Sequence, residues 1–120
     1  MDADLLDGKH ANEFQLKKRK VLRVDAKDIN SFVVPDDAEI VEIFNYNDLL
    51  TITLPKATNY IGRFLVIILS SPGAGHSFAI QPQSKEYLNM QEEIVETSPM
   101  SFILTATTPT HWFILSKTPI

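Results

Sequence analysis

The sequence predicts an all-β protein built as an antiparallel β-sandwich or a jelly-roll-like knob of about eight short strands. From residue 21 onward, apolar or alternating runs recur at intervals of roughly ten residues and are separated by turn-forming residues. No stretch carries a sustained helical stripe of apolar residues with caps. The composition, 44% hydrophobic and 22% charged, is ordinary for a globular protein.

The chain divides into two regions that differ in composition and in hydrophobic pattern. Residues 1–20 are polar and charged and end in a basic run at 17–20, whereas residues 21–120 carry the strand pattern. We therefore expect a short leader, 1–20, followed by one β domain, 21–120. The longest apolar run, 64–69, is far too short to span a bilayer as a helix.

Each expected strand is an apolar or alternating run that ends at a turn signal. Leu50, Ile52 and Leu54 alternate with threonines and stop at Pro55, which is typical of a strand with one buried face. The run 63–69 is nearly all apolar and predicts a strand covered on both faces, within the domain or at a subunit contact. Only 7–16 and 86–96 leave room for a helical turn. In chain order the expected strands are 21–24, 32–34, 39–44, 50–54, 63–69, 77–81, 101–106 and 112–115.

Several expected strands are apolar on both faces, as where Ile40 and Phe44 flank Val41 and Ile43. A domain of about 100 residues buries only about two-thirds of its surface by itself. The excess of apolar residues therefore favours an oligomer.

No catalytic or metal site is expected. The neighbouring carboxylates at 36–37 and 92–93 would point to opposite faces of a strand, so neither pair converges on a substrate. The chain has no cysteine, and His10, His76 and His111 lack a ligand spacing. We expect no enzyme activity and no cofactor.

Nucleic acid is not an expected partner either. The net charge is −4, and the basic run at 17–20 has no aromatic platform beside it.

Aromatic residues in turn-forming segments are the best candidates for ligand contact. A tyrosine ring can stack on a sugar while neighbouring amides and carboxylates bind its hydroxyl groups. The alternative is that these rings only close the ends of the domain. The candidate segments are 45–48, 71–76 and 87–92, and the candidate residues are Asn45, Tyr46, Asn47, Asp48, His76, Tyr87 and Asn89.

Residues 3–14 resemble a motif that recurs in bacteriophage tail-fibre and tail-tip proteins, Ala-Asp-x-Leu-Asp-Gly-x-His-Ala-x-x-Phe. Leu5, Asn12 and Glu13 depart from the residues that often stand at those places. A looser resemblance to fibre-end modules follows the order of segments 52–55, Gly62, 66–69, 80–82 and 112–115. The positions that match the first motif are Ala3, Asp4, Leu6, Asp7, Gly8, His10, Ala11 and Phe14.

The resemblance implies a homotrimer that ends a longer fibre, located in the virion after synthesis in the host cytoplasm. Leu5, Leu6 and Phe14 would then pack near the threefold axis. The knob would bind a host-surface receptor, expected to be a polysaccharide or lipopolysaccharide, and its other partner would be the rest of the tail fibre. One alternative is a module that only trimerises or caps the fibre. A small depolymerase is another, but long β-helical repeats and convergent acids are not visible in the sequence.

Overall fold

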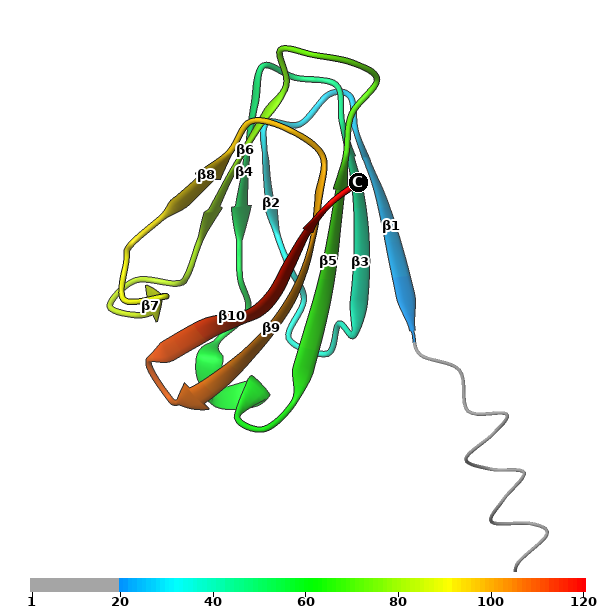
Figure 1. Ribbon diagram of the computed structural model, residues 1–120. Helices are drawn as coiled ribbons and strands as arrows, with labels where there is room; N and C mark the ends of the chain where they lie inside the picture. Colours follow the sequence, from blue (N-terminus) through cyan, green and yellow to red (C-terminus); the bar gives the residue numbers. More distant parts are fainter. Residues whose placement is uncertain (1–19) are drawn as a thin grey trace, which may run out of the picture.

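The computed structural model describes residues 20–120, and within this range the expectation of an all-β fold is confirmed (Figure 1). The chain forms two sheets and one short 3₁₀ helix, η1 (Ala57–Tyr60). The strands are β1 (Val21–Ala26), β2 (Ser31–Val33), β3 (Ile40–Asn45), β4 (Leu49–Thr53), β5 (Phe64–Ser70), β6 (Ser77–Gln81), β7 (Tyr87–Leu88), β8 (Ile94–Glu96), β9 (Met100–Thr108) and β10 (His111–Pro119).

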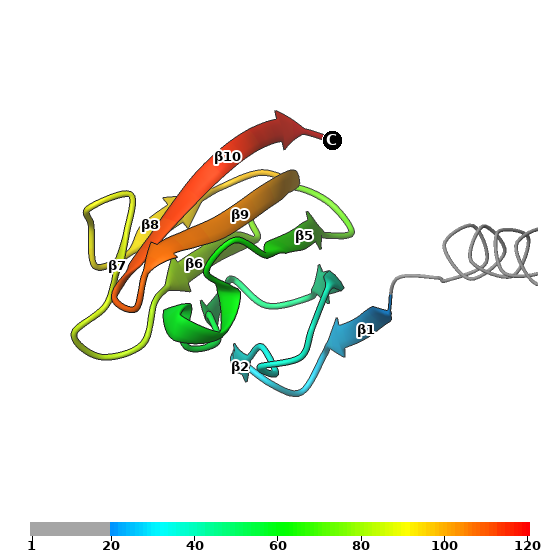
Figure 2. The ribbon, with the colours of Figure 1, turned by 90° about the horizontal axis from the view of Figure 1, so that it is seen from below.

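The first six strands alternate between the two sheets. β1, β3 and β5 are parallel neighbours in the six-stranded sheet. β2, β4 and β6 are likewise parallel neighbours in the four-stranded sheet. The chain therefore winds as a solenoid-like coil, seen along its strands in Figure 2. The predicted antiparallel arrangement is wrong for these strands. Alternation of apolar and polar residues marks which face of a strand is buried, and it does so equally for parallel and antiparallel pairing.

The register shows how the coil repeats. Val21 lies beside Ile40, and Ile40 lies beside Val66, in the six-stranded sheet. In the other sheet Phe32 lies beside Ile52. The segment between β4 and β5 contains η1, which makes the second turn of the coil longer than the first.

Antiparallel strands close the coil at its far end. β9 pairs with β5, β10 with β9, and β8 with β6, all antiparallel, so the prediction holds for this part of the domain. β7 joins the outer edge of β10 through two residues. Segment 86–96, for which the sequence allowed a helical turn, forms β7 and β8 instead.

The core lies between the two sheets. Inward-facing residues of both sheets, such as Ile43, Ile67 and Ile80, are fully buried. One end of this core is sealed by Tyr60 and Trp112, whose ring centroids are 5.1 Å apart. Both rings also donate hydrogen bonds to backbone carbonyls: the Tyr60 hydroxyl to Ala38 at 2.6 Å and the Trp112 Nε1 to Pro55 at 3.3 Å. Aromatic rings with a polar handle are suited to such a closing position.

Candidate functional site

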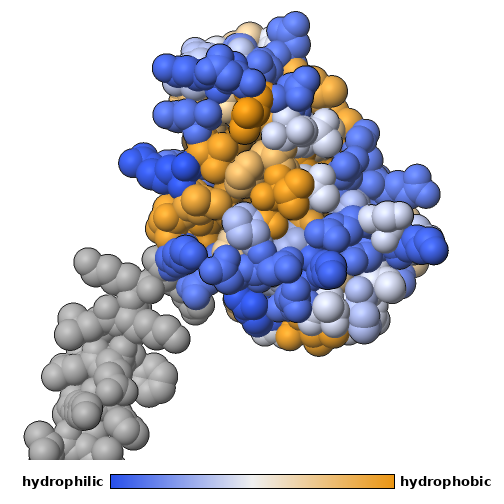
Figure 3. All heavy atoms as spheres, turned by 180° about the vertical axis from the view of Figure 1, so that it is seen from behind, coloured by the Kyte–Doolittle hydropathy of each residue, from blue (hydrophilic) through white to orange (hydrophobic). Residues whose placement is uncertain are grey.

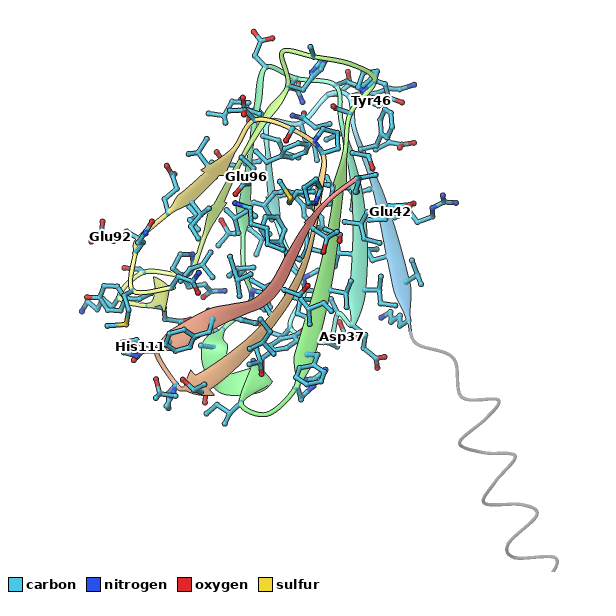
Figure 4. The ribbon with its side chains drawn as sticks, viewed as in Figure 1. Asp37, Glu42, Tyr46, Glu92, Glu96 and His111 are labelled. Carbon is cyan, nitrogen blue, oxygen red and sulfur yellow. The ribbon has the colours of Figure 1, made fainter. Side chains whose placement is uncertain are left out.

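The predicted receptor segments lie at opposite ends of the domain. Segments 45–48 and 71–76 follow β3 and β5 and lie side by side at the end where Tyr46 is labelled in Figure 4. Segment 87–92 begins in β7, which lies at the other end, near His111. The coil therefore divides the candidates into two separate groups.

Asn45 is fully buried, and its side chain builds the turn. Its Oδ1 accepts a hydrogen bond from the backbone N–H of Asn47 at 2.8 Å. Its Nδ2 donates to the carbonyls of Asn47 and Ser77, both at 3.0 Å. As a receptor contact Asn45 is therefore a wrong prediction, because a buried amide with these bonds does not face solvent.

Asn47 and His76 join three neighbouring turns. The Asn47 Nδ2 donates to the carbonyl of Ala26 at 2.8 Å. The His76 Nδ1 lies 2.8 Å from the Asn47 carbonyl, a contact in which the ring nitrogen must be the donor. Both residues are half-buried, whereas Asp48 is exposed, and the carbonyl of Asp48 accepts from the backbone N–H of Ser77 at 2.8 Å. This end is thus a platform of turns that are hydrogen-bonded to one another.

Tyr46 stands on that platform with 39% of its surface exposed. Its ring centroid lies 4.9 Å from that of Phe44, with the planes tilted by 53°. The Lys27 Nζ lies 5.1 Å from the centroid of the same ring, a cation–π contact. Tyr46 is therefore an aromatic side chain that is held in place and still open to solvent.

A hollow of about 510 Å³ lies on the outer face of the six-stranded sheet, on β1, β3 and β5. Its lining mixes both charges, a hydroxyl group and an aromatic ring, and the Phe44 ring connects it to Tyr46. The residues of this "sheet hollow" are Arg23, Val24, Asp25, Glu42, Phe44 and Ser70.

An ion pair crosses the sheet hollow. The Arg23 Nε lies 2.6 Å from the Glu42 Oε1, and these residues are neighbours in the register of β1 and β3. The hydrogen bond to the Glu42 carboxylate raises the pKa of Arg23 above its usual value. The guanidinium keeps further donors for a ligand, because this pair engages only its Nε.

At the opposite end of the domain, the side chain of Asn89 also forms a hydrogen bond that stabilises the fold. Its Oδ1 accepts from the backbone N–H of Ile114 at 2.9 Å, and its own N–H donates to the Trp112 carbonyl at 2.9 Å. Its φ of 50° is a left-handed conformation, which asparagine tolerates better than most residues. Asn89 therefore anchors β7 to β10.

Tyr87 is exposed to the same degree as Tyr46, 39%, and its ring centroid lies 5.5 Å from that of His111. It borders a smaller hollow of about 240 Å³. The other residues around this hollow are Pro82, Gln83, Ser84, Lys85, Glu86 and Glu92.

Other predicted contacts lie outside the described residues, namely Leu5, Leu6 and Phe14 of the expected threefold contact. Within 20–120, no group of three or more histidine, cysteine, aspartate or glutamate side chains is arranged to hold a metal ion. No helix in this range is long and apolar enough to cross a membrane.

The sequence pattern missed most of the sheet hollow. Arg23 and Glu42 stand nineteen positions apart, like Val21 and Ile40, which are also neighbours across β1 and β3. Only the parallel pairing of β1 with β3, which the sequence pattern did not predict, places their opposite charges side by side. Comparison with known proteins adds no family, since neither a protein-family model nor a curated protein matches this chain.

Proposed function

We propose that the chain is the knob of a bacteriophage tail fibre or tail tip, and that it binds a host-surface glycan at the sheet hollow and Tyr46. The observation that carries the binding proposal is the aromatic pair Phe44–Tyr46 at the border of a hollow lined by charged and hydroxyl groups. The phage assignment rests on the resemblance of residues 3–14.

The chemistry of the hollow suits a sugar. An exposed tyrosine ring can stack on a pyranose face, and the Asp25 carboxylate, the Arg23 guanidinium and the Ser70 hydroxyl can bind sugar hydroxyls. The hollow is shallow, so one site would bind weakly. Several copies on one fibre raise the apparent affinity by as much as about 10²–10⁴-fold, and a deep pocket is then unnecessary.

The solenoid-like topology also supports the proposal that this domain belongs to a fibre. Solenoids grow by stacking turns, and each turn contacts only its neighbours. Within residues 20–120, the antiparallel strands β9 and β10 end the row of parallel strands on one side, and β1 and β2 each leave an edge unpaired on the other. A domain that ends a longer fibre is suited to this arrangement.

Tyr46→Ala and Tyr87→Ala form a matched pair for testing the binding site, because both rings are 39% exposed and each contacts one other ring. We expect Tyr46→Ala to weaken binding to host cells, and to purified host polysaccharide or lipopolysaccharide, by about tenfold, because one lost stacking contact costs about 1–2 kcal/mol. Tyr87→Ala should bind as the wild type does. Equal losses, or a loss only with Tyr87→Ala, would contradict the proposed site.

The alternative is a module that caps the fibre and leaves receptor binding to another part. The antiparallel closure by β9 and β10 favours it, because solenoid ends need such caps. Unchanged adsorption by both tyrosine variants, with an unchanged oligomer mass, would support the cap. A small depolymerase is the other alternative, and release of reducing sugar from host polysaccharide would indicate that activity.

A further inference from the structure

The outer face of the six-stranded sheet carries an apolar row across four strands. Val21, Ile40, Val66 and Ile103 are successive neighbours in the register of β1, β3, β5 and β9. Phe64, two residues before Val66, extends the row on the same face of β5. Val21 is 54% exposed and Phe64 60%, and Ile40 and Val66 are half-buried. We call these five residues the apolar ladder.

The other sheet shows that an apolar outer face is not a general property of this coil. Its outer positions in the central strands β4 and β6 are mostly polar, including Thr51, Thr53 and Gln81. Both sheets contribute inner residues to the same core, so the need for a core does not explain the difference. An extended apolar patch on one face of a soluble domain marks a contact surface.

The apolar surface continues around β1 to the open end of the coil. β1 pairs only with β3, and β2 only with β4, so both strands leave one edge unpaired in the described domain. Figure 3 looks onto this end and shows apolar side chains gathered over the two strands. The residues concerned include Leu22, Val24 and Phe32, which are half-buried, and Val33, which is 61% exposed. Unpaired edges beside an apolar face favour association with another chain.

Charge at the ladder indicates what covers it. Two cations at its border are already paired: Lys20 with Asp37 at 3.0 Å, and Arg23 with Glu42 at 2.6 Å. These pairs offer no excess of one charge that would select an oppositely charged partner. Two copies of the chain can bring these faces together without repulsion between the paired groups, although each copy carries a net charge of −4.

We propose that the apolar ladder is the surface through which copies of this chain associate. The nineteen residues before Lys20 join the domain at Val21, a member of the ladder, so all copies would enter the contact from the same corner. Contact between the ladders would cover the outer residues of β5, whose all-apolar run predicts cover on both faces. The sheet hollow lies two residues farther along the same face of β1 and β3, at Arg23 and Glu42, so a contact centred on the ladder would border it. Oligomer mass tests the ladder, and glycan binding by Tyr46→Ala tests the hollow.

Val21→Glu and Val95→Glu form a matched pair for the test. Both valines lie on outer faces and are nearly equally exposed, at 54% and 53%, but Val95 belongs to β8 in the other sheet. We expect the full 120-residue wild type to exceed 13.5 kDa by light scattering coupled to size exclusion, with 40.5 kDa indicating three copies. Val21→Glu should reduce the mass to that of one chain, because association would bury a carboxylate. Val95→Glu should leave the mass unchanged.

Phe64→Glu provides a second variant, since Phe64 is 60% exposed and its replacement leaves the core intact. Circular dichroism should show native β structure in all three variants. A monomeric wild type would overturn the proposal, and so would the wild-type mass in both Val21→Glu and Phe64→Glu. An equal fall in mass with Val95→Glu would also overturn it, because the effect would then not be specific to the ladder.

Discussion

At the residue scale, Asn45 was predicted to contact a receptor, but its side chain stabilises a turn of the domain. Asparagine in a turn satisfies nearby backbone groups with its own amide, and Asn45 does so in full. Its bonds join the turn after β3 to Ser77 at the start of β6, so they also fix the base of loop 71–76. Tyr46 is the next residue, so it stands within this hydrogen-bonded turn.

We expect Asn45→Ala to lower the free energy of unfolding by about 2–3 kcal/mol, because three part-buried hydrogen bonds to backbone groups are lost, although the Asn47 carbonyl keeps its bond from His76. Asn59→Ala is the matched control, since Asn59 is exposed, and it should change stability by less than about 0.5 kcal/mol. Urea unfolding followed by tryptophan fluorescence measures both. Similar values for the two variants would show that the buried amide contributes little.

At the element scale, an ion pair joins the two sheets of the described domain. Glu96 on β8, labelled in Figure 4, forms a salt bridge with Lys117 on β10. The Glu96 side chain is only 10% exposed and that of Lys117 is 46% exposed. We expect Lys117→Met to destabilise the domain by about 2 kcal/mol, because a buried carboxylate then lacks its partner.

Lys20→Met removes the cation of an ion pair at the surface, since the side chains of Lys20 and Asp37 are 64% and 72% exposed, respectively. Its cost should stay below about 0.5 kcal/mol, as is usual for exposed pairs. Adding Glu96→Gln to Lys117→Met should recover part of the lost stability, because the unpaired charge is removed. If the double variant were no more stable than Lys117→Met, the cost would come from lost packing of the lysine stem.

The strands themselves could be read from the sequence. Leu50, Ile52 and Leu54 alternate with threonines and are all fully buried, because a one-sided strand must repeat every two residues. Strand direction could not be read in this way, since it depends on where the chain goes after each turn. Pro35 and Pro55 follow strand residues in the same register, twenty positions apart, but the next turn is longer, so the spacing does not repeat along the chain.

The candidate site was less predictable than the strands. Tyr46 could be found from its turn-forming neighbours, and it is exposed. Its neighbours in the sheet hollow come from three strands, so only the pairing of β1, β3 and β5 brings them together. Phe44 and Glu42 look like ordinary outer residues of one strand until Asp25 and Arg23 are placed beside them. Long-range register, which a single sequence does not encode locally, makes this surface.

At the scale of the whole molecule, the stability should depend on pH through Tyr60 in the sealed end of the core. Burial is the main cause that raises the Tyr60 pKa to about 12, against 10.0 for an ordinary tyrosine. Between these values the unfolded chain binds fewer protons than the folded one, so stability falls as the pH rises. Below about pH 10 both states keep the proton and the effect is absent.

Tyr60→Phe isolates this effect because it removes the hydroxyl and keeps the ring against Trp112. At pH 9 the variant should be less stable than the wild type by about 1 kcal/mol, since the 2.6 Å hydrogen bond to the Ala38 carbonyl is lost. Between pH 9 and pH 11 the free energy of unfolding of the wild type should fall by about 1–2 kcal/mol through Tyr60, a loss that the variant does not show. Urea unfolding followed by the fluorescence of Trp112, the sole tryptophan, measures the difference at each pH. A stability difference that stays constant from pH 9 to pH 11 would show that the core admits the tyrosinate.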